Sequence, residues 1–303
     1  MPELPDIIVY IDGLEKRIVG ERLKTVRIIA PSLLRTATPP LREAEGKRVI
    51  QLRRLGKRIC IRLEDDLWLV LHLMIAGRLH WKPLAAKLAR PRGLAAFDFE
   101  KGTLLWTEAG SQKRASLHFV QGEDGLQALN AGGVEIFGSN LEGFAKALQA
   151  ENHTLKRALT DPRIFSGIGN AYSDEILFHA QLSPMQLTQK MSPEQVERLF
   201  AATRATLQEW IDRLRSETRD KFPGKVTAFH DEMAVHGKYK EKCRRCGNMI
   251  QRIRYGSNEA NYCPFCQTGN KLLADRSLSR LLREDWPKTP EAMETHIERR
   301  KQT

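Results

Sequence analysis

Apolar residues recur at helical spacing near the start of the chain and then give way to short runs typical of strands. Between residues 6 and 20 this spacing predicts a helix, with apolar positions at Ile7, Ile8, Ile11, Leu14 and Ile18. From about residue 23 to 120 the β-rich runs are TVRII, RVIQL, RICIRL, LWLVLHLMI, AAFDFE and TLLWT, with turn-forming EDD and EKG between some of them. This pattern predicts an antiparallel sandwich or barrel.

The pattern is helical again from about residue 135 to 217. Its clearest helix begins at SPEQ, where Ser192 fits the N-cap, Pro193 the first helical position and Gln195 a capping box. The apolar stripe of this helix predicts core packing and comprises Val196, Leu199, Phe200, Thr203, Leu207, Trp210, Ile211 and Leu214.

A connecting segment, RDKFPGKVTAFHDEM, leads into a compact cysteine module and a basic tail. We therefore expect an α+β fold in four parts: a β-sandwich with flanking helices at 2–130, a helical domain at 131–222, the cysteine module at 235–268 and an extension at 269–303. In the extension, one short amphipathic helix is expected from Leu272, Leu273, Leu278, Leu281 and Leu282, and the final 17 residues are expected to be poorly ordered.

The charge of the chain favours a polyanionic partner. Its 303 residues carry 49 Lys and Arg against 37 Asp and Glu, a formal net charge of +12. Such a balance suits nucleic acid or an anionic membrane surface, and charge alone does not separate the two. No run approaches the ~18 apolar residues of a membrane span. With Glu3 and Asp6 at its start, the chain does not resemble a secretory signal, so we expect a soluble cytoplasmic protein.

The five cysteines are unevenly placed. Cys60 lies alone in an apolar run and is expected to be a buried, inert thiol. The others form two C-x-x-C pairs, Cys243 with Cys246 and Cys263 with Cys266, with 16 residues between the pairs. This spacing predicts one structural Zn²⁺ held by four thiolates on a β-hairpin, the alternative being a reduced or redox-active set. The basic side chains there, Arg244, Arg245, Arg252 and Arg254, indicate nucleic-acid contact or simply a solvated basic face.

A glycine turn precedes another helical pattern at SGIGNAYSDEILF. A helix, a glycine turn and a second helix N-terminus at Asn170 together offer backbone N–H groups to a phosphate. Lys156 and Arg157, on the preceding helix, would add positive charge. An ordinary interhelical turn is the alternative.

With these pieces in order, residues 2–268 resemble the formamidopyrimidine-DNA glycosylase/endonuclease VIII family of base-excision repair enzymes. The resemblance rests on PELPD, GKRICIRL, HLMIAGRL, GIGNAYSDEILF and the four-cysteine finger. It implies a β-sandwich, a helix–two-turns–helix domain and a zinc-finger hairpin. It also implies damaged DNA as partner and excision of an oxidised base followed by strand cleavage at the abasic site.

The resemblance assigns roles to individual residues. Pro2, once Met1 is removed, would be the amine nucleophile, and Glu3 the proton shuttle. Lys57 would contact phosphate and transfer protons near the lesion, and Asn170 would hold the phosphate beside it. Without the resemblance, a Met-Pro start is common and Lys57 would be a solvated strand residue.

The sequence departs from the family where DNA is probed. Asn258 stands where the hairpin usually carries an arginine, which leaves Arg252 or Arg254 as substitutes and puts the second elimination in question. Ile75, beside Met74, takes the place of a methionine that fills the gap left by the flipped base. A later loop has Lys113 and Arg114 where the family has an Arg-Phe pair.

We expect a monomeric, bacterial-type, nucleoid-associated DNA glycosylase and AP lyase without a small-molecule cofactor and without membrane contact. Two alternatives remain open at this point. One is an AP lyase, or an enzyme of the endonuclease VIII type that prefers oxidised pyrimidines or single strands. The other is a zinc-containing protein that binds damaged DNA without catalysis.

Overall fold

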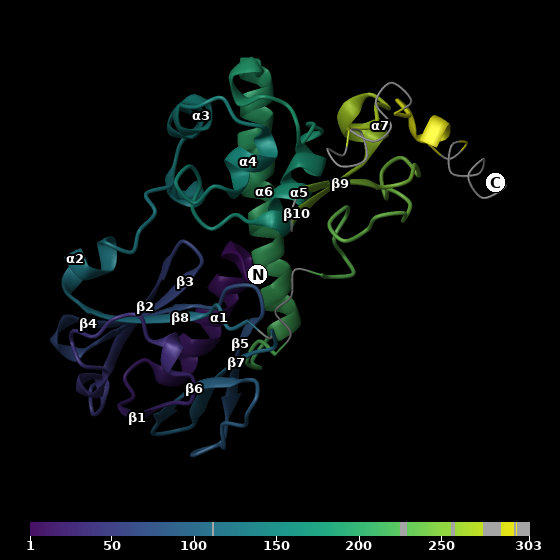
Figure 1. Cartoon of the computed structure of the whole chain (residues 1–303). Helices are drawn as coiled ribbons and strands as arrows, with labels where there is room; N and C mark the ends of the chain where they lie inside the picture. Colours follow the sequence, from purple (N-terminus) through teal and green to yellow (C-terminus); the bar gives the residue numbers. More distant parts are fainter. Residues whose placement is uncertain (111, 225–228, 256–257, 275–285, 294, 296–303) are drawn as a thin grey trace. The chain divides into compact units, whose positions relative to one another are not determined.

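The computed structural model describes residues 1–110, 112–224, 229–255, 258–274, 286–293 and 295. The chain forms two compact units, one of residues 1–133 with 208–228 and one of 134–207 with 229–303. The zinc module and most of the helical region share the second unit, and residues 208–222 belong to the first (Figure 1). The four-part division expected from the sequence stays a prediction.

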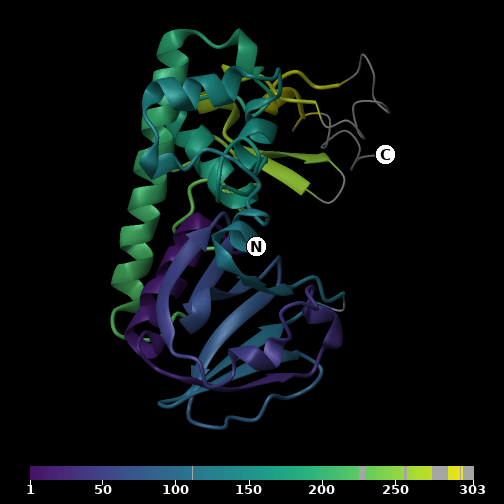
Figure 2. The ribbon, with the colours of Figure 1, turned by 90° about the vertical axis from the view of Figure 1, so that its left-hand side faces the viewer.

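Two four-stranded antiparallel sheets make up most of the first unit (Figure 2). One has the order β1-β6-β7-β5 and the other β2-β3-β4-β8. The strands are β1 Leu23–Ile28, β2 Val49–Leu55, β3 Arg58–Leu63, β4 Leu67–His72, β5 Gly77–Lys82, β6 Gly93–Phe99, β7 Thr103–Glu108 and β8 Ser116–Gln121. Both sheets and helix α1, Leu4–Ile18, contribute to one core, so the predicted sandwich is confirmed; core side chains include Tyr10, Leu14, Ile59, Leu69, Phe97, Trp106 and Phe119.

One apolar run of the sequence contains a turn. LWLVLHLMI was expected as one strand, but β4 ends at His72 and β5 begins at Gly77. The Gly77 N–H donates to the Leu73 carbonyl oxygen at 3.0 Å, and this bond closes the turn. A Cβ on Gly77 would lie 2.1 Å from that oxygen, so the turn requires glycine. The hydropathy pattern concealed it because two turn residues, Met74 and Ile75, are apolar.

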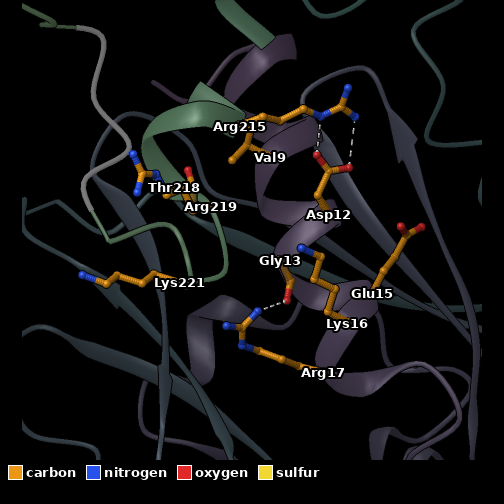
Figure 3. A pocket seen from close by; sticks show the side chains of 10 residues that line it. All are labelled: Val9, Asp12, Gly13, Glu15, Lys16, Arg17, Arg215, Thr218, Arg219 and Lys221. Atoms are coloured by element: carbon orange, nitrogen blue, oxygen red, sulfur yellow. Dashed lines mark hydrogen bonds and ion pairs between the residues drawn. The ribbon is translucent and has the colours of Figure 1, made fainter. Parts of the chain in front are cut away.

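Helix α1 packs against the last turns of helix α6, Pro193–Thr218, within the first unit. Arg215 donates to both carboxylate oxygens of Asp12, at 2.7 and 3.2 Å, and Arg17 donates to the Gly13 carbonyl (Figure 3). The two elements border a pocket of about 400 Å³, which does not include Pro2, Glu3 or Lys57. The pocket is lined by Val9, Asp12, Gly13, Glu15, Lys16, Arg17, Arg215, Thr218, Arg219 and Lys221.

The second unit consists mainly of short helices, together with the zinc module, which is the cysteine module at residues 235–268. They are α3 Leu141–Gln149, α4 Leu155–Thr160, α5 Asn170–Ala180 and α7 Pro264–Thr268, and the hairpin strands are β9 Gln251–Tyr255 and β10 Asn258–Tyr262. A short α2, Gly122–Gln127, belongs to the first unit. The capping box expected at the start of α6 is present, since Ser192 and Gln195 exchange hydrogen bonds of 3.1 and 3.4 Å. Among the described residues, no helix is long and apolar enough to cross a membrane.

Part of the C-terminal extension returns to the zinc module. The Leu272 N–H donates to the Lys288 carbonyl, and the Leu273 N–H donates to the Tyr262 hydroxyl, both at 2.9 Å. Pro287 is buried. The residues around Lys288 are therefore placed by contacts, although the sequence predicted poor order for them. The amphipathic helix expected between Leu272 and Leu282 falls largely on residues 275–285, outside the described residues.

Candidate active site and DNA-contact surfaces

Helix α1 begins at Leu4, two residues after Pro2, the proposed nucleophile. Glu3 is its N-cap, and the Glu3 backbone N–H donates to Asp6 Oδ2 at 2.7 Å. Pro5 occupies the first turn, where a missing N–H costs nothing. Pro2, Glu3 and Asp6 are all buried, with Glu3 only 2% exposed. The local sequence therefore holds the start of the chain in a fixed conformation at the helix N-terminus.

The α-amino group at this end lies among charged side chains. It belongs to Met1 in this structure, and burial lowers its pKa. The carboxylates of Glu3 and Asp6 oppose that shift, while Arg78 and Lys57 add to it. An amine in these surroundings is more readily unprotonated near neutral pH, as a nucleophile must be. The sequence reasoning had found Glu3 and Lys57 but not Arg78, which lies at the start of β5.

Asp6 is the most perturbed carboxyl group at this end of the chain. Its pKa is raised to about 7, chiefly by burial and also by the nearby Glu3 charge, although the hydrogen bond from the Glu3 N–H opposes the shift. Tyr10 anchors the next turn of α1, since its hydroxyl accepts from the Leu79 N–H at 3.4 Å. These contacts connect the helix start to β5.

Lys57 occupies the tight turn between β2 and β3. Gly56 has φ +61°, which suits the first central position of a two-residue hairpin turn. The turn places Lys57, half-buried, close enough to the terminal amine to affect its pKa. The structure therefore brings the three predicted catalytic positions, Pro2, Glu3 and Lys57, to one end of the sandwich.

Side chains that can donate hydrogen bonds continue from this turn across three strands. Arg58 pairs with His72 across β3 and β4, and His118 lies on β8. Burial lowers the pKa of His72 to about 4, with Arg58, Lys57 and His118 adding to the shift. The buried Nε of Arg58 has no hydrogen-bond partner among the described residues. With its pKa near 4, His72 is neutral at pH 7, so the unsatisfied donor of Arg58 beside Lys57 is what favours an anion such as a DNA phosphate. Arg58 and His72 lie within the motifs GKRICIRL and HLMIAGRL, but the sequence alone assigned no role to them or to His118.

Two loops predicted to probe DNA lie side by side in the first unit. Met74 has φ +54° and is half-buried, whereas Ile75 at the tip of the turn is 58% exposed. The neighbouring loop approaches through the Ala109 N–H, which donates to the Ala76 carbonyl at 3.4 Å. An exposed isoleucine in a rigid turn has the shape and polarity of a wedge between bases.

The second loop is held by a buried carboxylate that the sequence reasoning missed. Glu108, 2% exposed, accepts the backbone N–H groups of Arg114 at 3.1 Å and of Ala115 at 3.3 Å. Lys113 donates to the Glu108 carbonyl at 2.5 Å. Lys113 is thus half-buried and engaged with backbone, while Arg114 is exposed and bonds Gln112.

In the second unit, Asn170 is the first residue of α5, after Gly169 at the N-cap. It lines a pocket of about 480 Å³ together with Asn152, His153, Thr154, Lys156, Arg157, Thr160, Met185, Leu187, Ile253 and Ala274. The exposed Arg157 guanidinium is the cation of this pocket with access to solvent.

Lys156 differs from its expected role. Its side chain is buried, and its ammonium donates to the Asn170 carbonyl at 2.6 Å, to Ser173 Oγ at 2.8 Å and to Asp174. Three partners use all three N–H groups, so none is left for a phosphate. The structure therefore corrects the expected DNA contact of Lys156: its ammonium holds residues at the start of α5 instead.

The four cysteines form a suitable zinc site. Their Sγ atoms all lie within 4.8 Å of one another, with Cys246 and Cys263 3.4 Å apart and Cys243 and Cys266 4.0 Å apart. A tetrahedron with Zn–S bonds of about 2.3 Å has edges of roughly 3.8 Å, so the set fits the ion. Four thiolates leave no open position, and the module therefore holds one structural Zn²⁺. The separate Cys60 is buried as predicted, and burial raises its pKa to about 12.

The hairpin arginines are partly engaged by an acid. Arg252 stacks on Tyr239 at 4.2 Å and lies 3.4 Å from Glu259, while the more exposed Arg254 lies 3.9 Å from the same carboxylate. Asn258 begins β10 opposite Tyr255 in the backbone register. Arg244 and Arg245 hold backbone instead, since Arg244 donates to the Asp231 carbonyl and Arg245 to that of Phe178.

Three family profiles together match most of the chain. They are the formamidopyrimidine-DNA glycosylase N-terminal domain at residues 1–118, its H2TH domain at 137–221 and the zinc finger found in FPG and IleRS at 240–269. Residues 270–303 lie beyond these matches. The formamidopyrimidine-DNA glycosylase of Variovorax paradoxus is 34% identical over 277 residues, 88% of this chain and all of that protein. That of Heliobacterium modesticaldum is 31% identical over 280 residues, with the same coverage.

Solved structures agree with these relatives. MutM in complex with DNA containing carbocyclic 8-oxo-G matches with a TM-score of 0.78 and 28% identity, over 88% of this chain and 100% of that one. Wild-type Lactococcus lactis Fpg with DNA containing an oxidised pyrimidine matches with a TM-score of 0.79 and 27% identity, at the same coverage. The sandwich with its buried N-terminal site, the helix turn at Asn170 and the four-cysteine finger are thus the parts of one known enzyme type, and the chain belongs to the formamidopyrimidine-DNA glycosylase family.

Proposed function

We propose that this protein excises oxidised bases from DNA through a Schiff base on Pro2 and cleaves the strand at the resulting abasic site. The observation that carries the proposal is the buried start of α1, where the terminal amine lies among Glu3, Asp6, Arg78 and Lys57. Family membership supplies the reaction class, a DNA glycosylase of base-excision repair with AP-lyase activity.

The chemistry follows from an unprotonated secondary amine. The nitrogen lone pair of Pro2 attacks the deoxyribose C1′, and the glycosidic bond breaks with its electron pair leaving on the base. The nitrogen's own proton neutralises the departing base, and Glu3 supplies a proton to the ring oxygen, so the sugar opens and the C1′–N bond becomes an iminium. The iminium acidifies the C2′ proton. Loss of that proton expels the 3′ phosphate, and a further elimination expels the 5′ phosphate.

Removal of Met1 is part of this proposal. While Met1 is present the Pro2 nitrogen is an amide and has no nucleophilic lone pair. After its removal the Pro2 amine would occupy the same buried surroundings, where burial and the cations Arg78 and Lys57 disfavour its protonated form.

The DNA contacts are proposed from both units. In the first, Lys57, Arg58 and His72 offer donors to phosphate, and Ile75 would enter the stack, with Met74, Lys113 and Arg114 beside it. In the second, Asn170, Arg157, Arg252 and Arg254 would hold the backbone. Structures of relatives contain DNA with carbocyclic 8-oxo-G, Fapy-dG or an oxidised pyrimidine, so oxidised purines and pyrimidines are both proposed substrates.

The remaining proposals concern the oligomeric state of the protein and its location in the cell. We propose a monomer in the bacterial cytoplasm, associated with the nucleoid, that works without a small-molecule cofactor and without membrane contact. The zinc ion would support the hairpin and take no part in bond breaking, because its four ligands are all protein thiolates.

A second function is favoured by the hairpin. Asn258 carries no charge, and Glu259 lies within 4 Å of both nearby arginines, so the phosphate grip is weaker than an arginine at 258 would give. This favours an AP lyase, or an enzyme of the endonuclease VIII type for oxidised pyrimidines or single strands, that stops after the first elimination. The ends of the cleaved strand distinguish one elimination from two.

Borohydride trapping tests the proposed reaction. Purified protein whose N-terminus has been verified by mass spectrometry is incubated with abasic-site DNA and borohydride. We expect a covalent adduct that is lost in Pro2→Gly, while Pro5→Gly serves as the matched control and retains it. A processed protein that binds this DNA but forms no adduct would leave the non-catalytic damage binder as the correct class.

A further inference from the structure

We propose that Asp174 and Asn261 are positioning residues, which fix the phosphate contact of Asn170 by joining the start of α5 to the zinc hairpin. The proposal rests on the proposed DNA contact of Asn170 and adds to it residues that do not touch DNA. Its carrier is a continuous chain of buried hydrogen bonds inside the second unit.

The first step connects Asn170 to Asp174. The buried Lys156 ammonium donates to the Asn170 carbonyl at 2.6 Å and to Asp174 Oδ1 at 2.5 Å. Its third donor goes to Ser173 Oγ at 2.8 Å, and Ser173 in turn donates to the Gly169 carbonyl at 2.6 Å. One ammonium on α4 therefore holds the backbone at the point where α5 begins.

The second step connects Asp174 to the hairpin. Asp174 Oδ2 accepts from Asn261 Nδ2 at 3.1 Å and from His236 Nδ1 at 2.7 Å. Asn261 lies on β10 and is 1% exposed, as is Asp174. A buried carboxylate requires such compensation, because an unpaired charge in the interior costs several kcal/mol. Burial opposes ionisation of Asp174, but Lys156 and then His236 hold its pKa below the usual range.

The adjacent carboxylate fixes the approach to the hairpin. Glu175 accepts three consecutive backbone N–H groups, those of Ala234 at 2.7 Å and of Val235 and His236 at 2.9 Å. On α5, Glu175 thus holds the segment that precedes the first zinc ligand, Cys243. The adjacent Asp174 holds strand β10, which precedes the third ligand. No ordinary surface helix needs two buried acids for its own stability.

As a consequence, the DNA contact at Asn170 and the DNA contacts of the zinc hairpin are held in a fixed position relative to each other. If the hairpin moves, Asn261 pulls on Asp174, and the bond network transmits the shift through Lys156 to the Asn170 backbone. Binding energy gained at Asn170 then depends on Asn261, although Asn261 itself is buried. A residue that only stabilised the fold would not show this dependence on Asn170.

A double-mutant cycle provides the test. Asn261→Leu keeps the Lys156–Asp174 pair and removes the hydrogen bonds of Asn261 to Asp174 and to Glu259. Asn170→Ala removes the phosphate contact. Affinity is measured for duplex DNA with a tetrahydrofuran abasic analogue, which needs no chemistry. We expect Asn261→Leu to weaken binding about threefold to tenfold in the wild-type background, and by less than twofold when Asn170 is already alanine.

Controls separate this result from misfolding and from failure of the reaction. Gln251→Leu changes a polar residue on the same hairpin outside the network and should leave affinity within twofold. Zinc content should stay at one per chain in Asn261→Leu, and Asp174→Asn should repeat the coupling more strongly. Equal weakening by Asn261→Leu in both backgrounds, or loss of zinc, would overturn the proposal. A wild type that binds the analogue but is not trapped by borohydride on DNA with a true abasic site would instead refute the proposed reaction and leave the coupling to be judged by the cycle.

Discussion

Asp6 accepts the backbone N–H of Glu3 at 2.7 Å, and the two carboxyl groups are buried within the same first turn of α1. Asp6 is therefore both a helix cap and a buried carboxyl group that faces the Glu3 carboxylate as well as the terminal amine and Arg78. This position raises its pKa to about 7, through burial first and the neighbouring Glu3 charge second.

The raised pKa predicts a pH dependence of folding stability. The folded state binds the Asp6 proton more tightly than the unfolded state, whose pKa is near 3.8, so the contribution is full below about pH 4. It is lost as the pH rises to about 7, by on the order of 4 kcal/mol. Asp6→Asn keeps the acceptor and removes the charge. We expect its urea-unfolding free energy to lose this slope and to exceed that of the wild type at pH 8.

A surface variant is the control for this experiment. Asp220→Asn alters a fully exposed carboxylate and should keep the wild-type slope between pH 4 and 7. An Asp6→Asn protein with an unchanged slope would show that Asp6 ionises normally in the folded state.

The turn after β4 predicts a strict requirement for Gly77. Its added Cβ would lie 2.1 Å from the Leu73 oxygen and 2.8 Å from the Leu73 carbonyl carbon, both of them backbone atoms. Gly77→Ala should therefore destabilise the protein by about 1–3 kcal/mol and displace Ile75. Urea unfolding and affinity for abasic-analogue duplex should both fall. Gly138→Ala, where nothing lies within 4 Å, is the matched control, and equal stability of the two variants would contradict the role of the turn.

The extension predicts a difference in zinc retention. Its backbone bonds the hydroxyl of Tyr262, the residue before a zinc ligand, and Leu272 bonds the returning segment at Lys288. A chain ending at Gly269 loses these contacts but keeps all residues matched by the family profiles. We expect faster zinc release to a colorimetric chelator and unchanged borohydride trapping at saturating zinc. Tyr262→Phe in the full chain should release zinc at an intermediate rate; release at the wild-type rate by the truncated chain would exclude this role.

The sequence predicted features that depend on local spacing. Four cysteines in two pairs and a Ser192–Gln195 capping box are fixed by residues close in the chain, and both are present. The strand-like runs predicted the sandwich correctly. They did not reveal the turn before Gly77, because the apolar turn residues Met74 and Ile75 resemble core residues in a hydropathy pattern.

Long-range pairing explains the features that the sequence did not reveal. Lys156 reads as a phosphate contact until its partner is known, and that partner, Asp174, also bonds His236, 62 residues further along. The Glu108 contact is local, since Arg114 lies only six residues later, but no spacing rule indicates that the carboxylate accepts N–H groups from this loop. Burial of a charged group is decided by the folded neighbours, which spacing does not supply.

The hairpin predicts a gain of affinity from removing one acid. Glu259 neutralises part of the charge of Arg252 and Arg254, at 3.4 and 3.9 Å, in a place where DNA phosphate would compete for them. Glu259→Gln keeps the side-chain length and should tighten binding to abasic-analogue duplex by about twofold to fivefold at low salt, since Arg252 and Arg254 would no longer face this carboxylate and their pairing with phosphate releases counterions from the DNA. The slope of log affinity against log salt should steepen by up to about 1. Glu241→Gln is the control, because its carboxylate pairs with Lys238 away from these arginines. An unchanged slope in Glu259→Gln would mean that neither arginine reaches a phosphate. No arginine of this hairpin strand would then replace the one that Asn258 lacks.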